Sequence, residues 1–319
     1  MLMISQLSAN QKINEEHFLV KKVDKKTARN GNNYYDLELN DSTGVIIGRI
    51  WDNALPACNF EIGKVIEVSG QTDEYNGKLS LIINACQIVN GEDIANFKTV
   101  IPTMVFDLET VGDKFEELDQ QQQDYLLNTL EKYEEDKEKS KKRTALYAIF
   151  GKICAAGCYN PDKKQGITIV IGEKKLCPEK NNFTYIVVKN EKELLEKFWE
   201  LASKVQRFVT FNGNNFDIPY LIIRSGINRV KIPFEIKKYS QNFIDLEDRL
   251  KQNGKPFKLE MLCRVFGIDD PKDKGVTGAE VSNLFYQKKF QQIADYVTRD
   301  AVATAELYQI WREYLSGEI

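Results

Sequence analysis

The feature that most constrains this chain is an apolar segment at residues 103–110 that ends in two acidic side chains, Asp107 and Glu109. Residues i and i+2 of a β-strand project from the same face, so these two carboxylates are expected to point together. Close carboxylates repel each other unless a proton or a cation neutralises them. Divalent cations such as Mg²⁺ prefer oxygen ligands of this kind. The segment therefore predicts a buried strand that leads into a metal site.

The Asp-Leu-Glu pattern is weak by itself, because it occurs at residues 36–38, 107–109 and 245–247. A solvated strand or the start of a helix is the ordinary interpretation of each copy. In the third copy, Asp245 either caps a helix or faces an active site, and both interpretations stay open at this point.

Two later segments distinguish the middle copy. Residues 211–221 are rich in asparagine and carry Asp217. Residues 296–300 carry Tyr296 and Asp300, which share one face if this part of the chain is helical, as its pattern indicates. The ordered set of motifs is far more specific than any one of them.

This order resembles the three exonuclease motifs of the DEDD superfamily, tyrosine subtype (DEDDy). Residues 216–221, Phe-Asp-Ile-Pro-Tyr-Leu, are similar to the exonuclease domains of B-family DNA polymerases and to their stand-alone bacterial and viral relatives. The resemblance covers roughly residues 100–315. It implies a ribonuclease H-like fold and a 3′→5′ exonuclease that hydrolyses phosphodiesters with two Mg²⁺ or Mn²⁺ ions.

The resemblance also assigns roles to single residues. It implies that the metal ligands are Asp107, Glu109, Asp217 and Asp300, with Asp107 bridging both ions. Tyr296 would orient the attacking water, since a phenol with a pKa near 10 is a poor base at neutral pH. Asn212 and Phe216 match substrate-side positions of the second motif, and Phe216 would stack on the terminal base.

The first part of the chain has a different character. Short strand patterns separated by turns occupy residues 18–23, 34–39, 45–51, 64–72 and 78–89. Asn-Gly at residues 76–77 is typical of a hairpin. Five short strands favour a small closed all-β barrel. Residues 41–52 also resemble OB-fold nucleic-acid-binding domains, in which bases stack on aromatic side chains.

Candidate nucleic-acid contacts of this barrel are the aromatic residues Tyr34, Trp51 and Tyr75. Basic residues that accompany them are Arg29, Arg49 and Lys78. The alternative is that the aromatic side chains belong to the barrel core. Residues 1–95 contain 9 Lys and Arg against 13 Asp and Glu, a net charge of −4. Strong phosphate binding by this region is therefore not expected.

The polar, aperiodic residues 90–99 predict a domain boundary. The expected domains are an OB-fold nucleic-acid-binding domain at residues 1–95 and a ribonuclease H-like exonuclease domain at residues 96–319. The fold class is α/β, a mixed sheet with helices preceded by an all-β barrel.

Within the second domain, strands are expected at residues 100–108, 152–159, 166–171 and 207–211. Helices are expected at residues 191–206, around 219–224, and at 293–314. Asn190 followed by Glu193 predicts a helix N-terminus. The charged segment 116–143 is either a solvated helix or a flap over the active site. Lys272 and Lys274 belong to a loop that is either solvated or in contact with the substrate backbone.

The composition of the chain limits its possible binding partners and its cellular location. The net charge of −3 gives no general attraction to nucleic acid or to an anionic membrane. No stretch reaches the ~18 apolar residues of a membrane span, and the first residues lack the pattern of a secretory signal. Six scattered cysteines and a single histidine, His17, argue against zinc. Reduced thiols and a cytoplasmic location are expected.

We therefore expect a metal-dependent 3′→5′ exonuclease that acts on single-stranded nucleic acid, with DNA favoured over RNA. An exoribonuclease with the same site stays open, because the motifs do not read the 2′-hydroxyl. A non-catalytic nucleic-acid-binding replication accessory protein is the other alternative. The presence of all four carboxylates argues against it.

Overall fold

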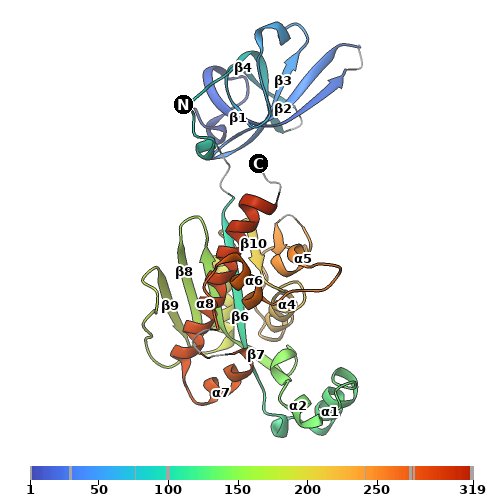
Figure 1. Cartoon of the computed structure of the whole chain (residues 1–319), viewed down its shortest axis with the longest axis vertical. Helices are drawn as coiled ribbons and strands as arrows, with labels where there is room; N and C mark the ends of the chain where they lie inside the picture. The colour runs from blue at the N-terminus through green and yellow to red at the C-terminus, as the bar shows by residue number, and fades with distance from the viewer. Residues whose placement is uncertain are drawn as a thin grey trace. The chain divides into compact units, whose positions relative to one another are not determined.

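The computed structural model describes residues 2–28, 31–75, 77–97, 101–240, 242–272, 275 and 277–316. The chain divides into two compact units, Met1–Val100 and Ile101–Glu318 (Figure 1). Arg29, Asn76 and Lys274, named from the sequence, lie outside the described residues. The assignment of the units to an OB-fold domain and a ribonuclease H-like domain stays a prediction.

The first unit is a closed five-stranded barrel with the strand order β1-β2-β3-β5-β4. Its elements are β1 Lys12–Thr27, β2 Asn33–Asp41, β3 Gly44–Trp51, β4 Val65–Tyr75 and β5 Lys78–Ile88, with 3₁₀ turns at Ile4–Gln6, Leu55–Ala57 and Ile94–Phe97. The predicted barrel is thus confirmed, with a first strand much longer than expected. Two register shifts bend β1, so one strand pairs with both β2 and β4 and closes the barrel.

Alternation along the strands fills the barrel. Leu37 and Leu39 of β2 are fully buried, and Ile50 of β3 and Leu81 of β5 join them in the core. A glycine is required at position 70, because a Cβ there would collide with the carbonyl oxygen of Ile82 on the neighbouring strand. The apolar face of each strand therefore points inward and its polar face is left outside.

The second unit is built on a mixed six-stranded sheet with the order β11-β10-β6-β7-β8-β9. Its strands are β6 Thr103–Gly112, β7 Gly151–Asn160, β8 Gln165–Ile171, β9 Phe183–Val188, β10 Arg207–Thr210 and β11 Phe243–Asp245. β7 pairs antiparallel with β6 and with β8, whereas β9, β10 and β11 add in parallel. The sequence patterns did not predict β9.

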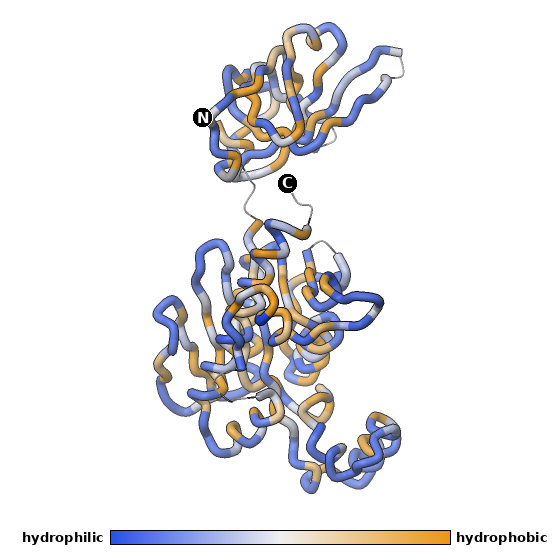
Figure 2. Tube along the Cα trace, in the orientation of Figure 1, coloured by the Kyte–Doolittle hydropathy of each residue, from blue (hydrophilic) through white to orange (hydrophobic). Residues whose placement is uncertain are grey.

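Helices cover both faces of this sheet. They are α3 Glu191–Ala202, α4 Asp217–Ile227, α5 Leu246–Leu250, α6 Leu259–Phe266, α7 Val281–Tyr286 and α8 Phe290–Ile310. One core cluster joins α8 to Val105 of β6, and the other joins α3 and α4 to Phe106 of β6. Figure 2 shows hydrophobic residues concentrated along the sheet strands. Helix α3 begins after Asn190, as predicted, but it ends four residues earlier than expected.

The charged segment 116–143 forms short helical pieces, α1 Gln120–Tyr125, a π-helical turn at Leu126–Leu130, and α2 Lys137–Lys141. It has a small core of its own around Leu118, Leu126 and Phe150. Glu131 accepts hydrogen bonds from Arg143 at 2.7 Å and from the Tyr147 hydroxyl at 2.5 Å. The segment is therefore a broken, internally tied helical insert, and its role as a flap stays a prediction.

Within the described part of the chain, no helix combines the length and apolar character that a membrane crossing requires. All six cysteines are free thiols.

Candidate active site

Strand β6 carries the first pair of carboxylates on the face that α8 covers. Val105 of β6 packs in the α8 cluster and Phe106 in the opposite one, so alternation places Asp107 and Glu109 on the same side as Val105. Helix α8 lies close to this face because β7 has glycine at position 157. A Cβ there would lie 2.6 Å from the carbonyl oxygen of Val297. The close approach of α8 to the sheet brings Tyr296 and Asp300 toward β6.

Three carboxylates meet at this point. Asp107, Glu109 and Asp300 each offer one oxygen, and these oxygens all lie within 4.8 Å of one another. Glu109 is 7% exposed and Asp300 is 8% exposed, while Asp107 is partly exposed. The Oδ1 atom of Asp300 is buried and has no hydrogen-bond partner among the described residues. Such an arrangement is costly without a positive charge.

Asp217 belongs to the same electrostatic group. It is the first residue of α4 and is 3% exposed. Its Oδ1 accepts a hydrogen bond of 3.1 Å from the backbone N–H of Leu108, the residue between Asp107 and Glu109. A contact between residues 109 positions apart thus ties the second motif directly to the first.

Burial raises the pKa of all four carboxyl groups, and the neighbouring cluster carboxylates add to the effect at Asp107 and Glu109. Burial, followed by the neighbouring carboxylates, raises the pKa of Asp107 and Glu109 well above the usual range. Burial raises the pKa of Asp217 to about 7 against the effect of backbone N–H groups. It raises that of Asp300 to about 6, although Tyr296 and Lys272 act to lower it. The fold therefore holds acidic groups where their ionised forms are disfavoured.

These residues fit a divalent cation. The donors are carboxylate oxygens, the ligand type that Mg²⁺ and Mn²⁺ prefer. Three of them converge on one point, one buried oxygen lacks a hydrogen-bond partner among the described residues, and a cation would stabilise the ionised carboxylates. Asp217 stands beside this cluster and not within it, so the four predicted ligands form a group of three and a neighbour.

Tyr296 is one helical turn before Asp300 on α8 and is 4% exposed. Burial, followed by the nearby carboxylate of Asp300, raises the pKa of its phenol far above the usual range. A phenol held in its protonated form donates a hydrogen bond and does not abstract a proton. Asp295 lies apart from the cluster, because it accepts hydrogen bonds from the Tyr185 hydroxyl at 2.7 Å and from Gln291.

The loop between β10 and α4 carries the two predicted substrate-side residues. Asn212 has a φ of 62°, and its side-chain oxygen accepts a hydrogen bond from the Asn215 amide at 2.9 Å. Phe216 is half-buried, with its ring 5.4 Å from that of Tyr220. Neither ring nor amide is fully buried. Phe216 also packs against the core cluster that joins α3 and α4 to Phe106.

Lys272 is a residue whose position the sequence could not define. Its ammonium lies 2.9 Å from Glu260, and its positive charge acts to lower the pKa of both Glu109 and Asp300. The loop therefore holds the ammonium group of Lys272 near the carboxylates. The sequence had also allowed a lysine that contacts only solvent.

The three aromatic candidates of the barrel fall into two settings. The rings of Tyr34 and Trp51 pack 5.0 Å apart on paired positions of β2 and β3, and the guanidinium of Arg49 lies 4.8 Å from the Tyr34 ring. Both rings are half-buried on the outer face, so they do not belong to the core. Tyr75 stands at the end of β4 and is 76% exposed.

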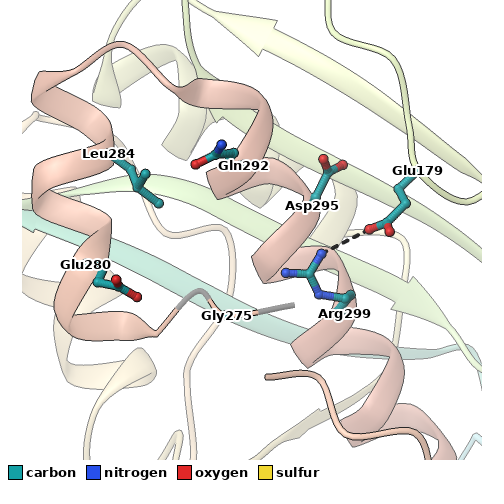
Figure 3. Close-up of a pocket in the computed structure, with 7 residues that line it drawn as sticks. All are labelled: Glu179, Gly275, Glu280, Leu284, Gln292, Asp295 and Arg299. Atoms are coloured by element: carbon teal, nitrogen blue, oxygen red, sulfur yellow. Dashed lines mark hydrogen bonds and ion pairs between the residues drawn. The ribbon is translucent and has the colours of Figure 1, made fainter. Parts of the chain in front are cut away.

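A separate pocket of about 550 Å³ opens beside α8 (Figure 3). Its lining residues are Glu179, Gly275, Glu280, Leu284, Gln292, Asp295 and Arg299. Asp295 and Arg299 each precede a member of the candidate site by one residue, about 100° around the helix. Arg299 is ion-paired with Glu179 at 3.0 Å. The pocket therefore lies against a different face of α8 from the carboxylate cluster.

Comparison with known proteins places this geometry in context. Residues 146–319 match a family described as a predicted 3′-5′ exonuclease related to the exonuclease domain of PolB. Asp217, Tyr296 and Asp300 lie inside the matched residues, and Asp107 and Glu109 precede them.

Two relatives match shorter stretches. A 3′-5′ exoribonuclease YhaM from Halalkalibacterium halodurans is 32% identical over 80 residues, which is 25% of this chain and 25% of that protein. A DNA polymerase from Methanocaldococcus jannaschii is 48% identical over 46 residues, 14% of this chain and 3% of the polymerase. The matched stretches thus span at most a quarter of these relatives.

Proposed function

This chain belongs to the family of 3′-5′ exonucleases related to the exonuclease domain of PolB, and on that premise we propose that it removes nucleotides from the 3′ end of single-stranded nucleic acid by two-metal hydrolysis. The family supports a nuclease with a nucleic-acid substrate. Our proposal goes beyond the family in three respects: the tyrosine subtype, the metal ligands and the choice of substrate.

The observation that carries the proposal is the group of buried carboxylates at the junction of β6, α4 and α8. Asp107, Glu109 and Asp300 converge within 4.8 Å, and Asp217 is joined to the same strand through Leu108. Buried carboxyl groups with raised pKa values mark a candidate functional site, and bound cations would stabilise their ionised forms. We propose that these four residues hold two Mg²⁺ or Mn²⁺ ions.

When bound, divalent ions in such a site lower the pKa of water and stabilise the charge on the attacking and leaving oxygens. The protein's own groups have complementary tasks. Tyr296, held in its protonated form, donates a hydrogen bond that orients the attacking water. Asp217 fixes the second motif against the backbone of β6. Phe216 and Asn212 hold the terminal nucleotide, with the ring of Phe216 stacking on its base.

The barrel is proposed to bind unpaired bases through Tyr34 and Trp51, with Tyr75 as an exposed additional contact. Asp36 accepts hydrogen bonds from Arg49 at 2.8 and 3.2 Å and from Lys26 at 2.9 Å. Although burial acts to raise the pKa of Asp36, these bonds lower it. Because both cations already face a carboxylate, stacking contributes more to binding at this face than phosphate contacts do.

DNA is the first candidate substrate, and the similarity to an exoribonuclease supports RNA as the second. The deciding experiment uses 5′-labelled single-stranded DNA and RNA of the same sequence with Mg²⁺, Mn²⁺ or EDTA. Stepwise shortening from the 3′ end, abolished by EDTA, is expected on at least one of them, and the ratio of kcat/KM assigns the substrate. Binding without shortening in either metal would refute the nuclease and favour the non-catalytic alternative.

A further inference from the structure

The third copy of the Asp-Leu-Glu pattern has a structural role that the sequence left open. Asp245 ends β11, is 2% exposed, and lies opposite Thr210, the last residue of β10. The loop that carries Asn212 and leads to Asp217 begins immediately after β10. Asp245 therefore stands at the base of that loop.

Both oxygens of Asp245 are used by backbone N–H groups. Oδ1 accepts from Asn212 at 2.7 Å and from Glu247 at 3.1 Å, and Oδ2 accepts from Asn214 at 2.8 Å. The bond to Glu247 is the N-cap of α5. The other two reach across to the loop, so one buried carboxylate serves two elements.

The loop needs such a restraint. Asn212 adopts a left-handed backbone conformation with a φ of 62°, which asparagine tolerates better than most residues and which turns the chain sharply here. Its carbonyl then accepts from the backbone N–H groups of Asn215 at 3.2 Å and Phe216 at 3.1 Å, which turns the chain into α4. Asp217 follows directly as the first residue of that helix.

Hydrogen bonds connect this restraint to the strand that carries the carboxylate cluster. Asp245 holds Asn212 and Asn214, this loop sets the start of α4, and Asp217 at that start accepts from the N–H of Leu108. Asp217 is the one predicted ligand that stands outside the group of three. Its place is therefore set by the loop that leads into α4 together with the single bond from Leu108 of β6.

We propose that Asp245 is a positioning residue that sets the place of Asp217 beside Asp107, Glu109 and Asp300, and thereby the affinity of the second metal ion. This inference rests on the proposed function. A carboxylate is needed because both of its oxygens accept. An asparagine amide would offer an N–H₂ group to one of the backbone N–H donors, and a serine hydroxyl would reach only its own helix.

Two variants of the full chain separate positioning from capping. Asn and Ser are both good N-cap residues, so Asp245→Asn and Asp245→Ser preserve the cap of α5. Neither preserves both bonds to the loop. Glu247→Gln is the matched control, because it changes a neighbouring carboxylate on α5 that makes none of the bonds described above.

The first measurement is a titration with Mn²⁺ in the absence of nucleic acid. Electron paramagnetic resonance of the free ion reports how much Mn²⁺ is bound. One site, held by Asp107, Glu109 and Asp300, should keep its affinity within about threefold in both variants. The site that needs Asp217 should weaken by about tenfold or more. Glu247→Gln should titrate like the wild type.

The second readout is the division of the kinetic effect on a labelled single strand. Small displacements of catalytic groups cost up to ~10²-fold in rate. We expect kcat to fall by about 10- to 100-fold, and the fall should be larger for Asp245→Ser than for Asp245→Asn. KM should change by less than about threefold in both variants. A residue that only capped α5 would leave kcat and both Mn²⁺ sites unchanged in the two variants, and that result would overturn the inference. Thermal unfolding shows whether each variant is folded. If Asp245→Asn does not fold, the Mn²⁺ titration and the kinetics of Asp245→Ser test the inference.

The two proposals fail in different ways. A wild-type protein that cleaves no nucleic acid with either metal counts against the proposed function, whereas the Mn²⁺ titration still decides the role of Asp245. A wild-type protein that cleaves, with both variants equally active and equally able to bind Mn²⁺, counts against the role of Asp245 alone.

Discussion

Without divalent metal, the second unit should be less stable at pH 8 than at pH 5. Added metal should restore the stability that is lost at pH 8. In the metal-free fold, burial raises the pKa of Asp217 from 3.8 to about 7. A carboxyl group whose pKa is higher in the folded than in the unfolded chain stabilises the fold below pH 4, and that contribution disappears as the pH rises through about 7. Stability should therefore fall across this range.

The size of the effect follows from the pKa difference. At about 1.4 kcal/mol per pKa unit, a pKa of about 7 for Asp217 in the metal-free fold lowers the free energy of unfolding by roughly 3 kcal/mol between pH 5 and pH 8, because the unfolded chain is almost fully ionised at this position already at pH 5. The raised pKa values of Asp107, Glu109 and Asp300 act in the same direction. For a unit of this size, roughly 3 kcal/mol corresponds to a lowering of Tm by roughly 8 °C between pH 5 and pH 8. Metal binds the ionised ligands, so its stabilising effect should grow with pH.

The assay is thermal unfolding from pH 5 to pH 8 with EDTA, Mg²⁺ or Mn²⁺. A Trp51→Phe background confines the fluorescence signal to Trp199 and Trp311, which both belong to the second unit. Asp217→Asn is the control, because its side chain does not titrate and its pH slope in EDTA should be shallower. Equal slopes for the two proteins, or a metal effect as large at pH 5 as at pH 8, would refute the reasoning.

Three further outcomes are expected. Asp107→Ala should abolish cleavage while circular dichroism stays that of the wild type, and metal-dependent turnover at the normal rate would contradict its role. Tyr296→Phe should lower kcat by ~10²-fold yet leave Mn²⁺ binding unchanged, and a wild-type rate would make it a packing residue. Gly157→Val should push α8 away from the sheet and destabilise the protein by ~1–3 kcal/mol in urea unfolding, because its Cβ would lie 2.6 Å from Val297. Gly226→Ala, which meets open space, should be neutral or stabilising.

Patterns of short range in the sequence predicted the parts of the fold that depend on short-range geometry. The i, i+2 spacing of Asp107 and Glu109 and the i, i+4 spacing of Tyr296 and Asp300 fix which side chains share a face once strand and helix are assigned. The five barrel strands were also predictable, because turn residues separate them. Strand β9 was missed, although its run of aromatic and β-branched residues at Phe183–Val188 is typical of a strand. It is an edge strand that pairs only with β8.

Contacts between distant residues could not be predicted in this way. The bond from Leu108 to Asp217 spans 109 positions, and those from Asn212 and Asn214 to Asp245 cross from one strand end to the next. No periodicity encodes them, because they depend on the order of strands in the sheet. The sequence placed Asp245 near either a cap or an active site, and the structure gives it the cap together with a second set of partners.

The barrel leads to the last prediction, which concerns substrate length. If the barrel only tethers the strand, it supplies binding that is equal in the ground state and the transition state. Replacing Tyr34 and Trp51 together by alanine should then raise KM for a long single strand and leave kcat unchanged. Each lost stacking contact is worth ~1–3 kcal/mol, so a rise of about tenfold or more is expected.

Short substrates and salt test the same idea independently. A di- or trinucleotide occupies the carboxylate site alone, so its KM should be the same for the wild type and the double variant. Because Arg49 and Lys26 beside the two rings already donate hydrogen bonds to Asp36 and residues 1–95 carry a net charge of −4, we expect the barrel to make few phosphate contacts. The ratio of the two KM values on the long strand should therefore change little between 50 and 200 mM salt, a range over which six or more phosphate contacts would lose ~10³-fold in affinity. A fall in kcat on both substrate lengths would mean that the barrel supports the fold of the enzyme and does not hold its substrate. A KM ratio that decreases strongly with salt would mean that the barrel contributes phosphate binding and not stacking.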